Sequence, residues 1–407
     1  MRDKYKKILD ILGSHRQMVF MSGPRQCGKT TFAQWVLEQE GGGLYLNWDI
    51  HEDRRKILER VNLFTSFDFS SPEKPLVVFD EIHKFKDWKN FLKGQYDKYS
   101  AHIRILVTGS GRLDFFQKGK DSLAGRYFLF HLWPFTLSEF SKVSRKLMDF
   151  EQDPYVTSTL TNQNETEMRA IWENLTRFSG FPDPFTKADD RFYRVWSNTY
   201  RNQLIREDIQ QLSRLEKIDH LETLVLLLPG KIGSPISMDN LAKDISVSFD
   251  TVKKWLLLLE RYHVAFRLLP WTKKIGRAIS KERKLYLFNF AEIQDLGARF
   301  ENMIAIELLS AVSRWQETGE GNYSLCYVRD RDKNEVDFLI VKNQTPLILV
   351  EAKLGDENPS KSLIKIQSQL NIPAVQLVQK PNLKKVFLNG PNKLLVCDAV
   401  TWISSLP

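Results

Sequence analysis

The stretch FMSGPRQCGKTTF, residues 20–32, decides the fold of the N-terminal part of the chain. It follows the apolar run 18–21, which predicts a buried strand, and it leads into a helical pattern over 31–39. Its glycines let backbone N–H groups turn toward a phosphate, and the positive end of the following helix faces the same anion. The stretch therefore predicts a phosphate-binding loop, and with it a bound nucleotide.

The loop has the full pattern GxxxxGKT, which assigns roles to particular side chains. Lys29 is expected to reach the β and γ phosphates of ATP, and Thr30 is expected to ligate Mg²⁺. ATP and Mg²⁺ are thus the predicted cofactors. The residues predicted to contact the nucleotide are Gly23, Pro24, Arg25, Gln26, Cys27, Gly28, Lys29, Thr30 and Thr31.

A second segment supports the prediction of a nucleotide site. Residues 75–81, PLVVFDE, form an apolar run that ends in two acids, which suits a buried parallel strand with carboxylates at its C-terminal edge. Asp80 is expected to hold Mg²⁺ through water. Glu81 is expected to orient and activate the water that attacks ATP. Together the two segments predict ATP hydrolysis.

A third apolar strand, which begins at Arg104, ends in polar residues. Ser110 or Thr108 could sense the γ-phosphate, and the alternative is a simple turn. Arg112 or Arg126 could serve as an arginine finger, and the alternative for each is a surface or structural arginine.

The segments GPRQCGKT, VVFDEIHK, LVTGSG and LAGRYFLFHLWPFTLSEF together resemble the archaeal-type AAA ATPases of bacteria and archaea. Members usually carry Gly-Arg, then a short strand, then a Pro-Phe/Leu-Ser/Thr-hydrophobic-Glu-Phe segment, here at 125–126 and 134–140. The stretch 200–209 resembles the helical lid of the family. The resemblance covers nearly the whole chain, and it implies a parallel P-loop sheet and a homo-oligomeric ring, with a monomer or dimer left open.

The pattern that begins at residue 218 is typical of a winged helix-turn-helix. Three helical patterns, the second capped by Ser237 and the third opened by Ser248, precede two β-like segments at 264–269 and 284–288. Ten basic and two acidic residues lie from 253 to 284, a net charge of +8 against +9 for the chain. This favours DNA contact, and the alternative is a protein-contact module. The basic residues are Lys253, Lys254, Arg261, Arg267, Lys273, Lys274, Arg277, Lys281, Arg283 and Lys284.

The C-terminal part carries a second acidic pattern. A helix from about Arg299 precedes a predicted hairpin that bears Asp337 on its first strand and Glu351 and Lys353 at the end of its second. Strand alternation places the last two on one face, and the hairpin brings Asp337 roughly opposite them. Asp337 and Glu351 are predicted Mg²⁺ ligands, Lys353 would favour a hydroxide, and Glu301 could add a carboxylate.

This D…ExK pattern is the signature of the PD-(D/E)xK nuclease superfamily. The segments GARFENMIAIELL, EVDFLIV and LILVEAKLG resemble the nuclease-like domain that accompanies these ATPases. The alternative is a nuclease-like fold that binds without cutting. Gln367, on the next predicted helix, could touch substrate, and the alternative is an ordinary residue that faces solvent.

Composition narrows the class of protein. The 407 residues are 42% hydrophobic and 27% charged, as in a soluble globular protein. Three distant cysteines form no CxxC pair, which excludes a zinc ribbon and makes disulfides improbable. The N-terminus does not resemble a signal peptide, and no apolar run is long enough to span a membrane. A cytoplasmic location and no membrane partner are expected.

We therefore expect an α/β chain with an AAA-like core over 1–145, a helical lid over 146–217, a winged helix-turn-helix over 218–282 and a nuclease-like domain over 283–407. The predicted function is a Mg-dependent ATPase that acts on DNA, with cleavage at the D…ExK site as a further possibility. One alternative is an ATP-dependent switch whose C-terminal domain only binds a protein or nucleic acid. Another is a transcription regulator with the winged helix as its output.

Overall fold

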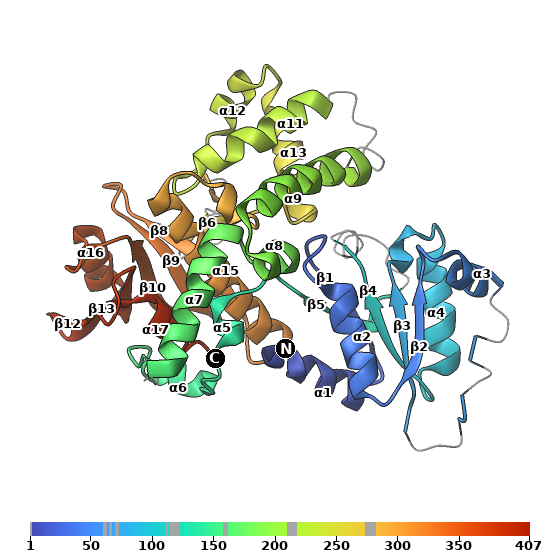
Figure 1. Cartoon of the computed structure of the whole chain (residues 1–407). Coiled ribbons are helices and arrows are strands. Elements are labelled where there is room, and N and C mark those ends of the chain that lie inside the picture. The colour runs from blue at the N-terminus through green and yellow to red at the C-terminus, as the bar shows by residue number, and fades with distance from the viewer. Residues whose placement is uncertain are drawn as a thin grey trace. The chain divides into compact units, whose positions relative to one another are not determined.

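The computed structural model describes residues 2–59, 63–64, 67–69, 73–110, 113, 123–157, 162–209, 218–272 and 282–407. The chain divides into two compact units, shown in Figure 1. The P-loop unit comprises Arg2–Pro134 together with Arg261–His263, and the C-terminal unit comprises Phe135–Glu260 and Val264–Pro407. The division into four domains stays a prediction.

The described residues of the P-loop unit contain a five-stranded sheet in the order β2-β3-β4-β1-β5, with every neighbouring pair parallel. The strands predicted at 18–21, 75–81 and from Arg104 are confirmed as β1, β3 and β4. The strands are β1 Met18–Ser22, β2 Gly43–Asn47, β3 Leu76–Asp80, β4 Arg104–Thr108 and β5 Tyr127–His131. The helices are η1 Asp3–Tyr5, α1 Lys6–Ser14, α2 Lys29–Gln39, α3 His51–Glu59, η2 Ile82–Lys84 and α4 Trp88–Tyr99.

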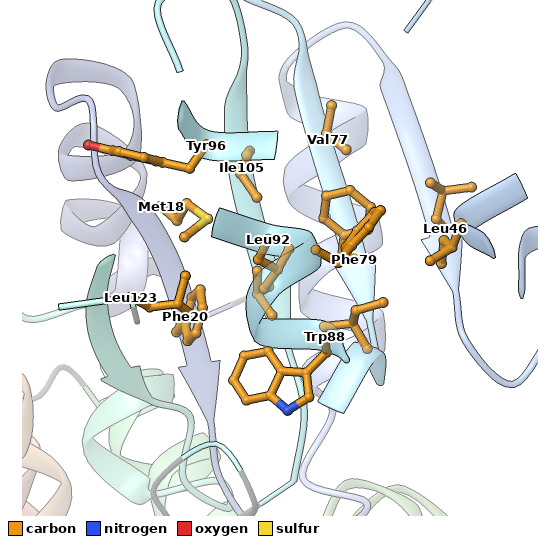
Figure 2. Packing of buried hydrophobic residues seen from close by; sticks show 14 of the residues in the cluster. Met18, Phe20, Leu46, Val77, Phe79, Trp88, Leu92, Tyr96, Ile105 and Leu123 are labelled. Carbon is orange, nitrogen blue, oxygen red and sulfur yellow. The ribbon is translucent and has the colours of Figure 1, made fainter. Parts of the chain in front are cut away.

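Two apolar clusters cover the two faces of this sheet. One contains Phe20 and Phe79 from the strands and packs under α3 and α4, as Figure 2 shows for part of it. The other contains Val19 and Val78 and packs under α1 and α2. Successive strand residues alternate between the clusters, which is why these strands are continuous apolar runs rather than alternating ones.

The C-terminal unit begins with helices. The predicted serine caps are confirmed, because Ser237 Oγ accepts from the backbone N–H of Asn240 at 3.3 Å and Ser248 Oγ accepts from that of Thr251 at 3.2 Å. The helical segments are α5 Leu137–Phe140, α6 Leu147–Gln152, α7 Asn162–Phe178, α8 Pro182–Lys187, α9 Asp190–Asn202, the π-helical η4 Gln203–Ile209, α11 Ile218–Leu227, η5 Leu228–Lys231, α12 Met238–Asp244 and α13 Phe249–Arg261.

An eight-stranded sheet follows in the described residues, in the order β12-β13-β11-β10-β9-β8-β6-β7. The two segments expected to form a wing, β6 and β7, pair antiparallel, and β6 also pairs in parallel with β8. The hairpin is therefore the edge of this sheet. The strands are β6 Ala265–Pro270, β7 Lys284–Leu287, β8 Tyr323–Arg329, β9 Glu335–Lys342, β10 Thr345–Lys353, β11 Ala374–Val378, β12 Lys384–Asn389 and β13 Asn392–Asp398.

The centre of this sheet has a defined order of elements. Helix α15, Leu296–Glu317, precedes the antiparallel strands β8, β9 and β10; helix α16, Lys361–Leu370, then leads to β11, which pairs in parallel with β10. An apolar cluster that includes Leu339, Leu349 and Ile366 joins the strands to α16. The remaining short helices are η6 Phe290–Glu292 and α17 Ala399–Ile403.

Candidate functional site

The loop between β1 and α2 needs its glycines for geometric reasons. Gly23 has φ +150°, and a Cβ there would lie 2.2 Å from the carbonyl oxygen of Leu132. Gly28 is the N-cap of α2 in the left-handed conformation, with φ 93°. Both positions exclude larger residues, so the loop backbone turns as a phosphate-binding loop requires.

Lys29 is held inside this loop. Its Nζ donates to the carbonyl oxygens of Gly23 at 3.1 Å and Pro24 at 2.6 Å, and the residue is buried. Cys27 is fully buried, and its Sγ donates to the carbonyl oxygen of Leu132 at 3.1 Å. The Cys27 side chain is therefore turned away from a phosphate, whereas Lys29 carries its ammonium within the loop.

Asp80, at the end of β3, is surrounded by neutral donors. Its Oδ2 accepts from Thr30 Oγ1 at 2.7 Å and from the Tyr45 hydroxyl at 2.6 Å, and Thr108 donates its hydroxyl to Oδ1. Asn47 Nδ2 lies 3.4 Å from Oδ2. The register explains this group, because Asp80 pairs with Asn47 on one side and with Thr108 on the other. We name these five residues the Asp80 cluster.

Tyr45 and Asn47 were not among the predicted site residues. The available signal was the apolar segment GLYLN, whose polar end marks another strand edge, but the order of the strands cannot be read from it. Burial, followed by the contact with Asp80, raises the pKa of Tyr45 well above its usual value. Tyr45 therefore acts as a neutral donor to the Asp80 carboxylate.

The Asp80 cluster fits Mg²⁺ chemically. The Thr30 hydroxyl and the Asp80 carboxylate are in direct contact, and hard oxygen ligands of these two kinds are what Mg²⁺ takes in nucleotide sites. The remaining partners of Asp80 in this cluster are neutral, so no protein cation competes for its charge within the cluster.

Glu81 follows Asp80 in a left-handed conformation, with φ 55°. Its backbone N–H donates to the carbonyl oxygen of Thr108, and its carboxylate lies 3.1 Å from Lys84 Nζ and 3.6 Å from His83 Nε2. Ser110 Oγ lies 3.4 Å from the same nitrogen of His83. The structure thus brings Glu81 and Ser110 to one strand edge through His83, a residue that the sequence did not single out.

The two candidate arginine fingers have different outcomes. Arg126 precedes β5, and its carbonyl oxygen accepts from the N–H of Met18, at the opposite end of β1 from the P-loop. Its guanidinium pairs with Asp97, with 2.8 Å between Nε and Oδ1. Arg126 therefore lies about a strand's length from the P-loop of its own chain, and its role as an arginine finger stays a prediction. Arg112 lies outside the described residues.

The predicted hairpin is confirmed in the C-terminal unit. Phe338 on β9 pairs with Val350 on β10, and the backbone N–H of Ala352 donates to Asp337 Oδ2 at 3.1 Å. Asp337 therefore lies opposite Glu351, as expected. Lys353 Nζ lies 3.0 Å from Glu351 Oε1.

Lys284, on β7, is the residue that joins these side chains to the helix. Its Nζ lies 2.9 Å from a carboxylate oxygen of Glu301 on α15 and 2.9 Å from one each of Glu335 and Asp337 on β9. The Lys284 side chain has no exposed surface. The Tyr286 hydroxyl donates to Glu301 at 2.8 Å. We name the Lys284 cluster by its members: Lys284, Tyr286, Glu301, Glu335, Asp337, Glu351 and Lys353.

This arrangement corrects the expectation for the basic segment. Lys284 was counted among residues that would contact DNA phosphates, yet its ammonium is buried among carboxylates. Arg267 was counted too, and its side chain is 2% exposed and forms two 2.7 Å hydrogen bonds to Glu260. Lys253 and Lys254 on α13 are exposed. The basic residues at 273, 274, 277 and 281 lie outside the described residues.

Burial and neighbouring charge set the protonation of the Lys284 cluster. Burial and the nearby Asp337 raise the pKa of Glu301 to about 7, against the opposing effect of Lys284. Burial alone would lower the pKa of Lys284, but Asp337, Glu301 and Glu335 raise it above its usual value. Burial and Asp337 also raise the pKa of Glu351. The carboxylates are therefore crowded, and Lys284 remains protonated among them.

The expected Mg²⁺ site at Asp337 and Glu351 is not ready-made. Among the described residues, no group of three or more His, Cys, Asp or Glu side chains is arranged to hold a metal ion. The place between Glu301 and Asp337 belongs to the Lys284 ammonium instead. Lys284 therefore holds, beside Asp337, a position that a divalent cation would otherwise share.

Gln367 on α16 also differs from its expectation. It is fully buried rather than solvent-facing, because its Nε2 donates to the carbonyl oxygen of Lys393 at 2.8 Å and its Oε1 accepts from Asn389. It joins α16 to the β12–β13 hairpin and is a structural residue.

Three segments of the chain match models of known protein families. Residues 15–141 match the AAA domain model. The N-terminal unit carries a P-loop domain of the AAA type. This match supports ATP binding and, in general terms, ATPase activity. Residues 169–291 and 296–399 match two domains of unknown function, DUF8612 and DUF4143.

Two curated relatives match the chain, the uncharacterized protein Rv2008c of Mycobacterium tuberculosis and the uncharacterized protein Mb2031c of Mycobacterium bovis. Each is 23% identical over 270 residues, which is 66% of this chain and 54% of the relative. The chain thus spans about half the length of these relatives.

Solved structures give a weaker likeness. Drosophila ORC bound to DNA is 11% identical, with 69% of this chain and 90% of that one covered and a TM-score of 0.29. AMPPCP-bound DnaA from Aquifex aeolicus is 17% identical, with 63% and 85% covered and a TM-score of 0.26. Across its described portion, the chain contains no helix that is both long and apolar enough to cross a membrane.

Proposed function

We propose that the chain is a Mg-dependent ATPase that acts on DNA. The observation that carries the hydrolysis part is the contact between Thr30 Oγ1 and Asp80 Oδ2 at 2.7 Å, beside a P-loop whose lysine is held inside the loop. Lys29 binds the phosphates, and Thr30 and Asp80 hold Mg²⁺. When bound, Mg²⁺ supplies positive charge that neutralises charge developing on the phosphates.

Glu81 is the proposed base for the attacking water. Its carboxylate lies beside Asp80 in the chain but pairs with Lys84 and faces His83. Ser110, which contacts the same histidine, is positioned to sense the γ-phosphate. While Glu81 pairs with Lys84, its carboxylate is not available to the attacking water. We therefore expect this ion pair to lower the rate of ATP hydrolysis.

DNA is the proposed partner of the C-terminal unit. Helices α12 and α13 precede the antiparallel strands β6 and β7, an order that supports a winged helix-turn-helix, and α13 presents Lys253 and Lys254 to solvent. Exposed basic residues on such a helix suit phosphate contacts. Arg126 could serve only the nucleotide site of a neighbouring chain, which would require the homo-oligomer that AAA resemblance implies.

A nuclease-like C-terminal domain is the second candidate function. The order α15-β8-β9-β10-α16-β11, with Asp337, Glu351 and Lys353 on adjoining strands, supports a PD-(D/E)xK-like arrangement. A specific observation favours the alternative in which this domain binds without cutting. Lys284 neutralises the carboxylates that cleavage would need for a metal ion.

The test measures ATP turnover and nucleotide affinity with and without DNA. We expect Lys29→Ala to lose nucleotide binding and Glu81→Gln to keep binding but lose turnover, and we expect DNA to stimulate the wild type. Normal turnover by Glu81→Gln would remove that residue from the role of base. Turnover that no DNA changes would favour a nucleotide switch over an ATPase that acts on DNA. Incubation of the same proteins with linear, circular, single-stranded and branched DNA tests cutting separately.

A further inference from the structure

The Lys284 cluster contains more negative than positive charge. Four carboxylates, Glu301, Glu335, Asp337 and Glu351, face two ammonium groups, Lys284 and Lys353, and Arg329 Nη1 lies 3.7 Å from Glu335. With these seven groups ionised, the balance is minus four plus three, or −1. An imbalance of charge in a largely buried cluster is costly unless a cation or protons offset it.

Lys284 is placed at the centre of the acidic side. Its Nζ has three oxygens at 2.9 Å, contributed by Glu301, Glu335 and Asp337, so each of its three N–H donors has one acceptor. These oxygens come from a helix and a strand that converge on one point, as the ligands of a bound cation do. The ammonium is therefore the cation that the fold itself supplies there.

Glu351 shows that the cluster still has capacity for a ligand. Its Oε1 pairs with Lys353, but its Oε2 is buried and has no hydrogen-bond partner among the described residues. Glu351 is 2% exposed, so bulk water does not satisfy this oxygen. A buried carboxylate oxygen without a donor is rare, and it indicates a group that the cluster can accept.

We propose that Lys284 is the built-in cation of this cluster, that it takes the place of a divalent metal, and that Mg²⁺ or Mn²⁺ binds the carboxylates only when this ammonium is removed. The proposal rests on the second candidate function for the identity of the site, and it is independent of ATP hydrolysis. It means that the D…ExK residues of this chain form a metal-free charged cluster in its present arrangement.

Calorimetric titration of Mn²⁺ in nucleotide-free solution tests the proposal with Lys284→Met in the full chain. Removing one adjacent unit charge is expected to strengthen Mn²⁺ binding at least about tenfold over the wild type. The variant should gain one Mn²⁺ site per chain, and Mn²⁺ should raise its melting temperature. A folded Lys284→Met protein that gains no Mn²⁺ site would overturn the proposal.

Two controls separate this gain from a general charge effect. Lys342→Met removes another ion-paired lysine, on β9 and 2.6 Å from Glu151, and it should gain no Mn²⁺ site. The double variant Lys284→Met with Asp337→Asn should lose the site that the single variant gains. Equal binding by Lys342→Met, or by the double variant, would contradict the proposed ligands.

If Lys284→Met does not fold, the wild type and Asp337→Asn test the proposal instead. In nucleotide-free solution its melting temperature should not respond to Mn²⁺ more than that of Asp337→Asn. A wild-type response that Asp337→Asn abolishes would overturn the proposal, because a metal would then bind beside Lys284. If Lys284→Met binds Mn²⁺ but cuts no DNA, the proposal for Lys284 is supported and the nuclease function is not. The rate of ATP turnover is not affected by either result.

Discussion

Asp80 and Asp337 are both buried aspartates in or at the end of apolar strands, and their surroundings differ in one decisive respect. Asp80 accepts from the hydroxyls of Thr30, Tyr45 and Thr108, which are neutral. Asp337 accepts from the ammonium of Lys284. Neutral donors leave a carboxylate its charge, whereas a buried ammonium neutralises it. Each aspartate by itself predicts a bound cation. The side chains around it decide whether that cation is a metal ion, as proposed for Asp80, or a lysine, as at Asp337.

The largest expected effect is on ATP turnover, through Glu81 beside the Asp80 cluster. Glu81→Gln keeps the shape of the side chain but cannot accept a proton, so we expect the rate of ATP hydrolysis to fall by about 10²- to 10⁴-fold. Nucleotide affinity should stay near that of the wild type. Steady-state hydrolysis and equilibrium nucleotide binding measure the two effects. A loss of binding equal to the loss of rate would assign Glu81 a structural role instead.

The next largest expected effect is on the free energy of unfolding, when the buried ammonium of Lys284 is removed. Lys284→Met leaves Glu301, Glu335 and Asp337 without their shared partner, and we expect a loss of about 3–5 kcal/mol in metal-free buffer. Lys342→Met breaks a partly exposed pair and should cost no more than about 1 kcal/mol. Denaturant unfolding of both variants gives the comparison. Equal losses would mean that Lys284 is an ordinary ion-pair residue.

The strand positions and the hairpin register could be predicted from the sequence because they depend on local patterns. Apolar runs of the right length gave β1, β3 and β4, and the alternation in the hairpin placed Asp337 opposite Glu351. Lys284 could not be assigned correctly, because its partners lie 17, 51 and 53 residues away along the chain. Nothing local distinguishes a buried lysine in a basic segment from one that contacts phosphates.

The distance of Arg126 from the P-loop could not be predicted from the sequence, for a related reason. Its sequence context resembles an arginine near a nucleotide, but strand order and direction put it at the far end of β1. Sheet order depends on contacts between distant segments, and these cannot be read from one strand at a time. The same limit hid Tyr45 and Asn47, which reach Asp80 from a neighbouring strand.

The dependence of stability on pH tests the protonation of Glu301 in the Lys284 cluster. The pKa of Glu301 is raised to about 7 by burial and by Asp337, so the folded chain binds this proton more tightly than the unfolded chain does. The stability linked to Glu301 is therefore present below its ordinary pKa of about 4.5, and it is lost as the pH rises through about 7.

The comparison with Glu301→Gln isolates this effect. The wild type should lose stability relative to the variant as the pH rises from about 5 to about 8, by an amount on the order of 3 kcal/mol. Denaturant midpoints of both proteins across this range measure the difference. A difference that does not change with pH would show that Glu301 is not held at a raised pKa.

The smallest expected effect separates exposed basic residues from buried ones. Replacing Lys253 and Lys254 by Gln should reduce the slope of DNA affinity against salt by about one for each lysine. Replacing Arg267, which is paired with Glu260, should leave the slope unchanged in a folded protein. Fluorescence anisotropy at several salt concentrations measures the slopes. An unchanged slope in the double lysine variant would move the DNA contact away from α13.

The most direct test of the central claim is to count Mn²⁺ ions on the wild-type chain by electron paramagnetic resonance, with and without a non-hydrolysable ATP analogue. The account predicts one bound Mn²⁺ per chain with the analogue, lost in Lys29→Ala, and none without it. A Mn²⁺ ion that binds without nucleotide and disappears in Asp337→Asn would contradict the account, because the D…ExK carboxylates would then hold a metal rather than Lys284.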